Sequence, residues 1–374
     1  MTIAPFTIPV AAEEAAWVRD RVAASRWFEE PPGAGWAHGA NRDYMQRLQA
    51  YWLDGFDWPA AAANINRLPH VRVDVGDGFH LHAVHLRSSR ADARPLLIAH
   101  GWPGSILEFN AIFERLAEPE DPSQPAFHVV APSLPGYGWS DRPTAPIGPR
   151  AVARLYDALM GALGYERYLY QGGDWGCVIG GWVALESQRI MALHLNGFGL
   201  APANMKPDTP EELAWIQRGQ AVRARETGYL QIQGTKPQSL GFAMMDSPMG
   251  VAAWFAEKFV GWSGTEVTDP PYSMDWLLTN IMIYLSTRSF LTASWLYKGM
   301  FQEGGFAMPK GARVTVPTGV AHFPWDMLSF PPRAMVERGY NVTHWTDMPR
   351  GGHFASLEEP ELFLADLRDF AATL

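Results

Sequence analysis

Hydrophobic and polar positions alternate over residues 71–83, and this alternation predicts two strands. Apolar residues occupy every second position on both sides of Gly76-Asp77-Gly78. A glycine-rich turn of this kind joins paired strands. Upstream, residues 11–25 follow a helical pattern and residues 44–58 are rich in Trp and Tyr. The first part of the chain is therefore expected to lead through helical segments into a strand pair.

A different pattern begins near residue 94, where the strands are predicted as continuous apolar runs. These runs cover residues 95–100, 127–132, 168–170 and 193–195. Helical patterns separate them at residues 152–163 and 177–186. Strands that are buried on both faces lack polar alternation. The series therefore predicts a parallel sheet with helices on both faces.

Residues 201–308 interrupt this series with helical patterns and many aromatic residues. Short strands resume at 314–316 and 342–345, and a last helix is predicted from about 358 to 370. The expected organisation is an N-terminal extension with the first strands (1–90), an α/β core (91–200 and 309–374) and a helical cap (201–308). Ligands of such sheets bind beyond the carboxyl ends of the strands, where the cap would cover them.

Composition removes several classes of function. The 374 residues carry a net charge of −9 without a Lys/Arg run longer than a pair, which argues against nucleic-acid binding. The single cysteine, Cys177, excludes an internal disulfide and a cysteine-built metal site. The N-terminus lacks the features of a signal peptide, and no window approaches the roughly 18 apolar residues that cross a bilayer. We therefore expect a soluble, cytoplasmic protein.

The segment Gly172-Gly173-Asp174-Trp175-Gly176 lies between a predicted strand and a predicted helix. This is the setting of a nucleophile elbow, G-x-S-x-G, whose tight turn needs glycines. Here Asp174 stands at the nucleophile position. An aspartate after a glycine turn is also a common helix N-cap, but the strand-turn-helix context favours the nucleophile.

An aspartate at this position changes the chemistry that the elbow can perform. A carboxylate is ionised near neutral pH and needs no base in order to attack. When it attacks a saturated carbon it forms an ester, which activated water then hydrolyses in a second step. A serine would form an ether there, which water does not readily cleave. The substrate is therefore expected to carry an electrophilic saturated carbon.

The water-activating base is predicted to be His353, which follows two glycines and precedes the last helix. Its orienting acid should lie between the cap and His353. Asp326 fits best, and Asp347 and Glu337 remain rivals that spacing alone does not separate.

The loop His100-Gly-Trp-Pro-Gly104 follows the first core strand. In the elbow architecture, this loop donates one backbone N–H to an oxyanion hole, and the residue after the nucleophile donates the other. Those donors would be Trp102 and Trp175. An ordinary Gly/Pro turn is the alternative interpretation of the loop.

Together, these motifs resemble the microsomal-type epoxide hydrolases of the α/β-hydrolase superfamily, in a bacterial-like form without the membrane anchor. The likeness spans nearly the whole chain, from PF (5–6), YW…FDW (51–58) and LPH (68–70) through HGWPG (100–104), PGYGWS (135–140) and GGDWG (172–176) to VPTG…FPWD (316–326) and RGGHFASLEEPE (350–361).

The resemblance implies an α/β-hydrolase fold and hydrolysis of an epoxide to a diol without a cofactor or a metal. It also implies that two cap tyrosines hold the epoxide oxygen, and the matching positions are Tyr229 and Tyr297. The implied partners are a small apolar epoxide and water, in keeping with a low fraction of charged residues, 18%, and a high fraction of aromatic residues, 13%. A homodimer is compatible with the sequence. The chain departs from the mammalian member in lacking the anchoring helix and in having Asp326 where that member has Glu.

Two other functions stay open at this point. A haloalkane dehalogenase would share the Asp elbow and the histidine, but it would bind halide and would have no such N-terminal extension. A non-catalytic binding protein on the same fold would usually lack one member of the triad. His80, His82 and His85 also raise the question of a metal site, but no carboxylate or cysteine joins them locally.

Overall fold

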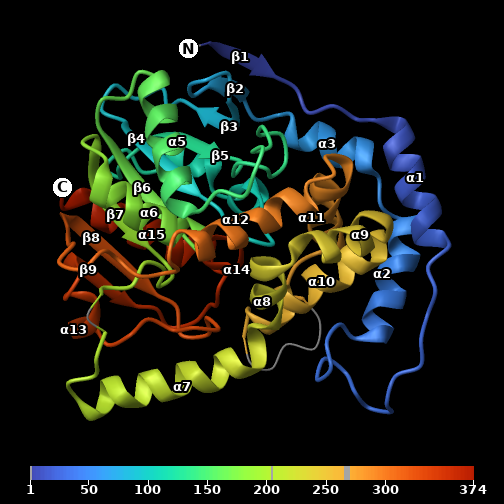
Figure 1. Cartoon of the computed structure of the whole chain (residues 1–374). Helices are drawn as coiled ribbons and strands as arrows, with labels where there is room; N and C mark the ends of the chain where they lie inside the picture. Colours follow the sequence, from blue (N-terminus) through green and yellow to red (C-terminus); the bar gives the residue numbers. More distant parts are fainter. Residues whose placement is uncertain (1, 204, 265–269) are drawn as a thin grey trace.

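The computed structural model describes residues 2–203, 205–264 and 270–374, and this part of the chain forms one nine-stranded sheet with helices around it (Figure 1). The strand order is β1-β2-β3-β5-β4-β6-β7-β8-β9. The strands are β1 (Ile3–Phe6), β2 (His70–Asp74), β3 (His80–Leu86), β4 (Arg94–Ala99), β5 (Phe127–Pro132), β6 (Tyr168–Gly172), β7 (Ile190–Leu195), β8 (Val314–His322) and β9 (Tyr340–Asp347).

The two predicted types of strand occupy different parts of the sheet. The strand pair around Gly76-Asp77-Gly78 is the antiparallel pair β2–β3, with Val73 opposite Leu81. The apolar runs form the parallel strands β5, β4, β6 and β7, which continue into β8 and β9. The short edge strand β1 was not predicted, because three of its four residues are exposed and it has no apolar alternation.

Helices cover both faces of the sheet. On one face, α5 (Pro149–Ala162) packs on α6 (Trp175–Glu186), and α6 contacts β4, β6, β7 and β8. On the other face lie α4 (Phe113–Ala117) and α15 (Pro360–Ala372), which an ion pair between Arg115 and Glu361 joins. Three short helices complete the core: η1 (Ile106–Phe109), α13 (Arg333–Val336) and α14 (Ala355–Glu358).

In the described part of the chain between β7 and β8, six helices form the cap (Figure 1, yellow to orange). They are α7 (Pro210–Glu226), α8 (Gly228–Thr235), α9 (Pro237–Asp246), α10 (Pro248–Gly261), α11 (Met274–Ser286) and α12 (Phe290–Gln302). Side chains of Thr209, Ser247 and Ser273 cap the first turns of α7, α10 and α11, which is why these helices start where they do. A backbone bridge between Ala201 and Ala307 ties the two ends of the insertion together.

Residues 3–65, which we call the strap, run from the edge of the sheet to the far side of the cap (Figure 1, blue). The strap contains β1, α1 (Ala12–Ala23), α2 (Arg42–Asp54) and α3 (Trp58–Ile65). Its helices contact α10 and α11. The Tyr51 hydroxyl donates to Asp275 at 2.8 Å, and Glu14 pairs with Arg288 at 2.5 Å. The strap therefore fastens the cap to the sheet.

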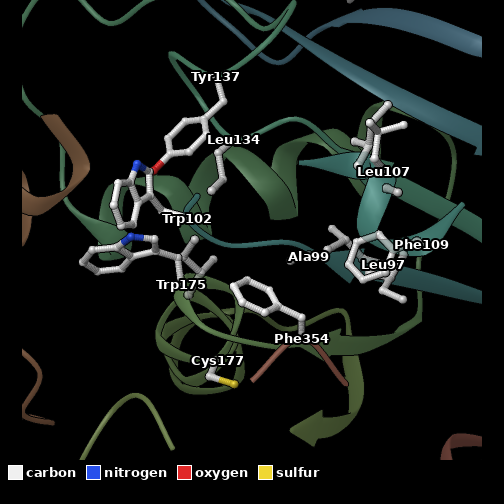
Figure 2. Packing of buried hydrophobic residues seen from close by; sticks show 14 of the residues in the cluster. Leu97, Ala99, Trp102, Leu107, Phe109, Leu134, Tyr137, Trp175, Cys177 and Phe354 are labelled. Carbon is white, nitrogen blue, oxygen red and sulfur yellow. The ribbon is translucent and has the colours of Figure 1, made fainter. Parts of the chain in front are cut away.

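The core is continuous from the sheet into the cap. Figure 2 shows part of it, with Leu97 and Ala99 of β4, Trp102 just beyond that strand, and Trp175 and Cys177 at the start of α6. Burial raises the pKa of the Cys177 thiol well above its usual value, so this cysteine is a packing residue. Within the described ranges, none of the helices has the length and apolar character that crossing a membrane requires.

Candidate active site

Asp174 stands on a tight turn between β6 and α6, with φ 47° and ψ −120°. The neighbouring glycines permit this turn. A Cβ on Gly172 would come within 2.4 Å of the Gly176 backbone, and a Cβ on Gly176 would come within 2.3 Å of the Ala99 carbonyl oxygen. Asp174 occupies the N-cap position of α6, but its side chain makes no capping hydrogen bond. The geometry therefore favours the elbow over the N-cap interpretation.

The two carboxylate oxygens of Asp174 have different partners. Oδ1 accepts a hydrogen bond from the Trp102 backbone N–H at 2.8 Å. Oδ2 lies 3.2 Å from Nε2 of His353. Trp175 is the first residue of α6, where a backbone N–H has no acceptor within the helix. The loop after β4 thus presents a backbone N–H to the carboxylate.

The structure brings Asp326, and not its rivals, to His353. Oδ1 of Asp326 lies 2.9 Å from His353 Nδ1, and both side chains are less than a tenth exposed. Asp347 instead contacts His322 at 2.9 Å, and Glu337 pairs with Arg333 on the surface. The three side chains Asp174, His353 and Asp326 form one hydrogen-bonded chain.

The neighbouring acids raise the pKa of His353. Burial lowers the pKa of this imidazole, but the charge of Asp326 and the hydrogen bonds to Asp174 and Asp326 outweigh it. The net result is a pKa well above the usual value. His353 therefore lies between two carboxyl groups that favour its protonated form.

Two further acids near the triad were missed from the sequence. Glu358 accepts hydrogen bonds from the backbone N–H groups of Gly352 at 2.9 Å and Phe354 at 2.8 Å, so it fixes the loop that carries His353. Burial raises the pKa of Glu358 to about 7. This residue lies inside RGGHFASLEEPE, but nothing in its spacing distinguishes it from the neighbouring acids.

Glu108 of η1 is the second missed acid. Burial, followed by the negative charge of Asp174, raises the pKa of Glu108 to about 8. Its Oε1 is buried without a hydrogen-bond partner, in the space that the missing side chain of Gly104 leaves. A single Glu after a Gly/Pro turn carries no signal in the sequence.

Tyr229 of α8 and Tyr297 of α12 line the same cavity as Asp174, and their ring centroids are 5.7 Å apart. Burial raises the pKa of both phenols well above the usual value, and the charge of Asp174 adds to both shifts. The indole of Trp102 stacks on Tyr229 at 5.1 Å with an angle of 6°, and meets Tyr297 edge-on at 5.8 Å. Trp175 also packs against Tyr297, at 4.7 Å. The two tryptophans thus pack their indole rings against the tyrosines, which the sequence did not indicate.

All five predicted side chains line one cavity of about 330 Å³. The rest of its wall is largely apolar and includes Val178, Phe198, Trp215, Leu230, Phe306, Met327 and Leu328. A larger cavity of about 670 Å³ lies between the strap and the α9–α10 corner, and neither Asp174 nor His353 lines it. The smaller cavity is the candidate active site because it holds the reactive groups.

The histidines of β3 do not form a metal site of the usual kind. His82 is buried and bonds to His70 at 3.0 Å and to the Ser133 hydroxyl at 2.9 Å. His80 contacts Asp141. Across the residues with described positions, no group of three or more His, Cys, Asp or Glu side chains could hold a metal ion.

Two regions of the chain match models of known protein families. Residues 3–109 match the family model of the epoxide hydrolase N terminus, and residues 94–245 match that of the alpha/beta hydrolase fold. Epoxide hydrolase 1 of Sus scrofa is 32% identical, over 100% of this chain and 89% of its own length.

Solved structures of epoxide hydrolases are similar to the whole chain. The Aspergillus niger epoxide hydrolase superposes with a TM-score of 0.86 at 29% identity, covering 100% of this chain and 97% of its own. The juvenile hormone epoxide hydrolase of the silkworm Bombyx mori gives a TM-score of 0.87 at 29% identity, covering 100% of this chain and 94% of its own.

Proposed function

The chain belongs to the epoxide hydrolase family, has the α/β-hydrolase fold and hydrolyses epoxides, and from this premise we propose that Asp174 is the nucleophile and His353 the base. The observation that carries the proposal is the hydrogen-bonded chain Asp174–His353–Asp326 in a cavity that two phenols also line. The match at residues 3–109 favours this activity over dehalogenation, for which no such N-terminal region is expected.

In the first step, a carboxylate oxygen of Asp174 attacks one ring carbon of the epoxide. The carbon–oxygen bond of the ring breaks, and its electron pair moves onto the ring oxygen. An alkoxide is a poor leaving group, so phenolic O–H groups must supply charge stabilisation and a proton. Tyr229 and Tyr297 are the donors in reach of the cavity above Asp174. The product of this step is an alkyl ester on Asp174.

Formation of the ester prepares His353 for the second step. The ester of Asp174 is neutral, so one of the charges that raise the His353 pKa disappears. The protonated imidazole then loses its proton. One proton returns to the phenolate of the tyrosine that protonated the ring oxygen. Neutral His353, oriented by Asp326, can now take a proton from water.

The resulting hydroxide adds to the ester carbonyl carbon of Asp174. The N–H of Trp102, which already donates to Oδ1, and that of Trp175 stabilise the oxyanion. Collapse of the tetrahedral intermediate releases the diol, whose oxygen takes the proton from His353, and leaves Asp174 as a carboxylic acid. This acid passes its proton to His353, which restores both the carboxylate and the protonated imidazole. Each turnover thus consumes one epoxide and one water and forms one diol, and this mechanism uses no cofactor.

The cavity suits a small, apolar epoxide, since most of its wall outside the triad and the two tyrosines is apolar. We assign residues 201–308 the role of a lid over the carboxyl ends of the core strands, with residues 91–200 and 309–374 as the catalytic core. Closure of this lid over substrate would exclude bulk water from the ring-opening step.

Mass spectrometry of variants tests the mechanism. Asp174→Ala should abolish diol formation, because no covalent ester can form. His353→Gln should still open the ring but trap an adduct on the peptide that contains Asp174. Asp347→Asn is the matched control, because this acid contacts His322 and lies outside the triad, and it should keep full activity. Full turnover by Asp174→Ala would overturn the mechanism.

A further inference from the structure

The cap buries a lysine against one of the two phenols. Lys258 of α10 is only 6% exposed, and its ammonium lies 4.8 Å from the ring centroid of Tyr229 and 5.7 Å from that of Trp262. Its ion-pair partner is Glu257, at 2.5 Å. Burying an ammonium carries a large desolvation cost, so its place beside the active-site tyrosine calls for a physical explanation.

The two tyrosines differ in their surroundings. The ring of Tyr229 has a cation over it and is stacked on Trp102. The ring of Tyr297 meets Trp102 and Trp175 edge-on, and no lysine or arginine within the described ranges lies over it. The pair is therefore chemically asymmetric, although both hydroxyl-bearing rings line the same cavity.

We propose that Lys258 is a positioning residue that makes Tyr229, rather than Tyr297, the acid that transfers its proton to the opening epoxide; this inference rests on the function proposed above. A phenolate spreads negative charge into its ring, and a nearby cation stabilises that charge more strongly than it stabilises the neutral phenol. The interaction therefore grows as the proton leaves, which is the condition for lowering the barrier.

The proton and electron balance of this step is simple. The Tyr229 O–H bond breaks and its electron pair stays on the phenolate. The proton forms a bond with the ring oxygen, whose new electron pair comes from the broken carbon–oxygen bond. Lys258 keeps all its protons and stabilises the phenolate through space. Tyr297 keeps its proton and donates only a hydrogen bond to the same oxygen.

Leaving-group basicity provides the first test. Ring opening of propylene oxide and of trifluoropropylene oxide is followed in single turnovers by tryptophan fluorescence, with wild type, Lys258→Met, Lys258→Arg and Glu257→Gln. Opening of propylene oxide gives a more basic alkoxide than opening of trifluoropropylene oxide. It therefore depends more strongly on general acid catalysis. Lys258→Met should therefore slow its opening by about 10-fold and that of the fluorinated epoxide by no more than about 3-fold. Lys258→Arg should restore the wild-type ratio of the two rates.

Glu257→Gln is the control, because it removes a negative charge near Tyr229 where Lys258→Met removes a positive one. Its carboxylate faces the same ammonium and, by its charge, raises the pKa of Tyr229, so its removal should not slow ring opening. The ratio of the two substrate rates within one variant does not depend on the fraction of folded enzyme. Equal slowing of both epoxides by Lys258→Met would show a packing role and overturn the inference.

A double-mutant cycle identifies the tyrosine concerned. Lys258→Met should add no further slowing in Tyr229→Phe, and should add its full effect in Tyr297→Phe. Equal additional slowing in both backgrounds would overturn the inference. If Tyr229→Phe is slow but Lys258→Met is not, only the role of Lys258 fails. If Tyr229→Phe opens propylene oxide at the wild-type rate, the proposed acid role of Tyr229 fails too.

Discussion

Gly101 leaves the space in which the Asp174 carboxylate lies. A Cβ on Gly101 would come within 2.1 Å of Asp174 Oδ1 and 2.3 Å of its Cβ. Gly101→Ala should therefore displace the nucleophile and slow ring opening by about 100-fold, as expected for a misplacement of about 1 Å. Single-turnover kinetics measures the loss. Gly219→Ala is the control, because its new Cβ would meet only the Arg223 guanidinium, at 3.5 Å; an equal loss there would contradict the steric explanation.

Glu108 should make folding stability depend on pH. Its pKa in the folded protein, about 8, is raised above the ordinary 4.5. Its contribution to stability is therefore fully present below about pH 4.5 and is lost as pH rises through about 8. Denaturant unfolding between about pH 5 and 9 should show a falling free energy of unfolding, and Glu108→Gln should reduce that fall. Glu114→Gln, an exposed acid on α4, should leave the pH dependence unchanged; an unaltered slope in Glu108→Gln would contradict the prediction.

The sequence predicted some of these residues and not others for physical reasons. Asp174 was identified because the glycines on both sides of it indicate a tight turn. Asp326 could not be separated from Asp347 and Glu337, because only the fold shows which acid reaches His353. Lys258 follows Glu257, and such a charged pair on a helix ordinarily faces water. Its burial depends on how α10 packs against α8, which has no local signal.

At the scale of elements, helix α12 approaches the core backbone closely enough to fix the height of Tyr297. A Cβ on Gly299 would lie 2.0 Å from the carbonyl carbon of Ile147 and 2.1 Å from its oxygen. Gly299→Ala should shift α12 and move Tyr297 away from the cavity. We expect slower ring opening together with a loss of about 1–3 kcal/mol in the free energy of unfolding.

Single-turnover rates and denaturant unfolding measure the two effects of Gly299→Ala. Gly261→Ala, at the end of α10, is the control, since its new Cβ would have only a Glu257 oxygen nearby, at 3.9 Å. Wild-type values of both quantities in Gly299→Ala would show that the contact does not position α12.

Elements with a strong periodic pattern were predicted well, and exposed ones were not. The buried strands β4 and β5 were predicted within about one residue of their bounds, because their continuous apolar runs follow directly from burial on both faces. Strand β1 depends on pairing with β2, and its exposed side chains leave no alternation to detect. Contacts between elements distant in the chain decide such cases.

At the scale of the molecule, the strap should stabilise the cap as well as itself. Leu48 of α2 is fully buried in the core that the strap shares with the cap. Leu48→Ala should lower the free energy of unfolding by about 2–5 kcal/mol, because it leaves a cavity in that core. Phe28→Ala, at a side chain that is 66% exposed, should change it by no more than about 0.5 kcal/mol.

Thermal unfolding followed by circular dichroism measures the effect of Leu48→Ala, and hydrogen exchange locates it. We expect α10 and α11 to lose protection together with α2, because the strap packs on both. Loss of protection confined to residues 3–65 would show that the strap and the cap unfold independently.

In laboratory evolution of this enzyme, the strained backbone of Asp174 creates a conflict between catalytic activity and thermal stability. A non-glycine residue held at φ 47° and ψ −120° stores strain of the order of 1–3 kcal/mol. Asp174→Gly would release that strain and remove the carboxylate in one substitution. A library of variants selected only for remaining folded after heating would therefore be enriched in inactive variants. Each round of selection has to demand diol formation as well as thermal survival, or the nucleophile is among the first residues lost.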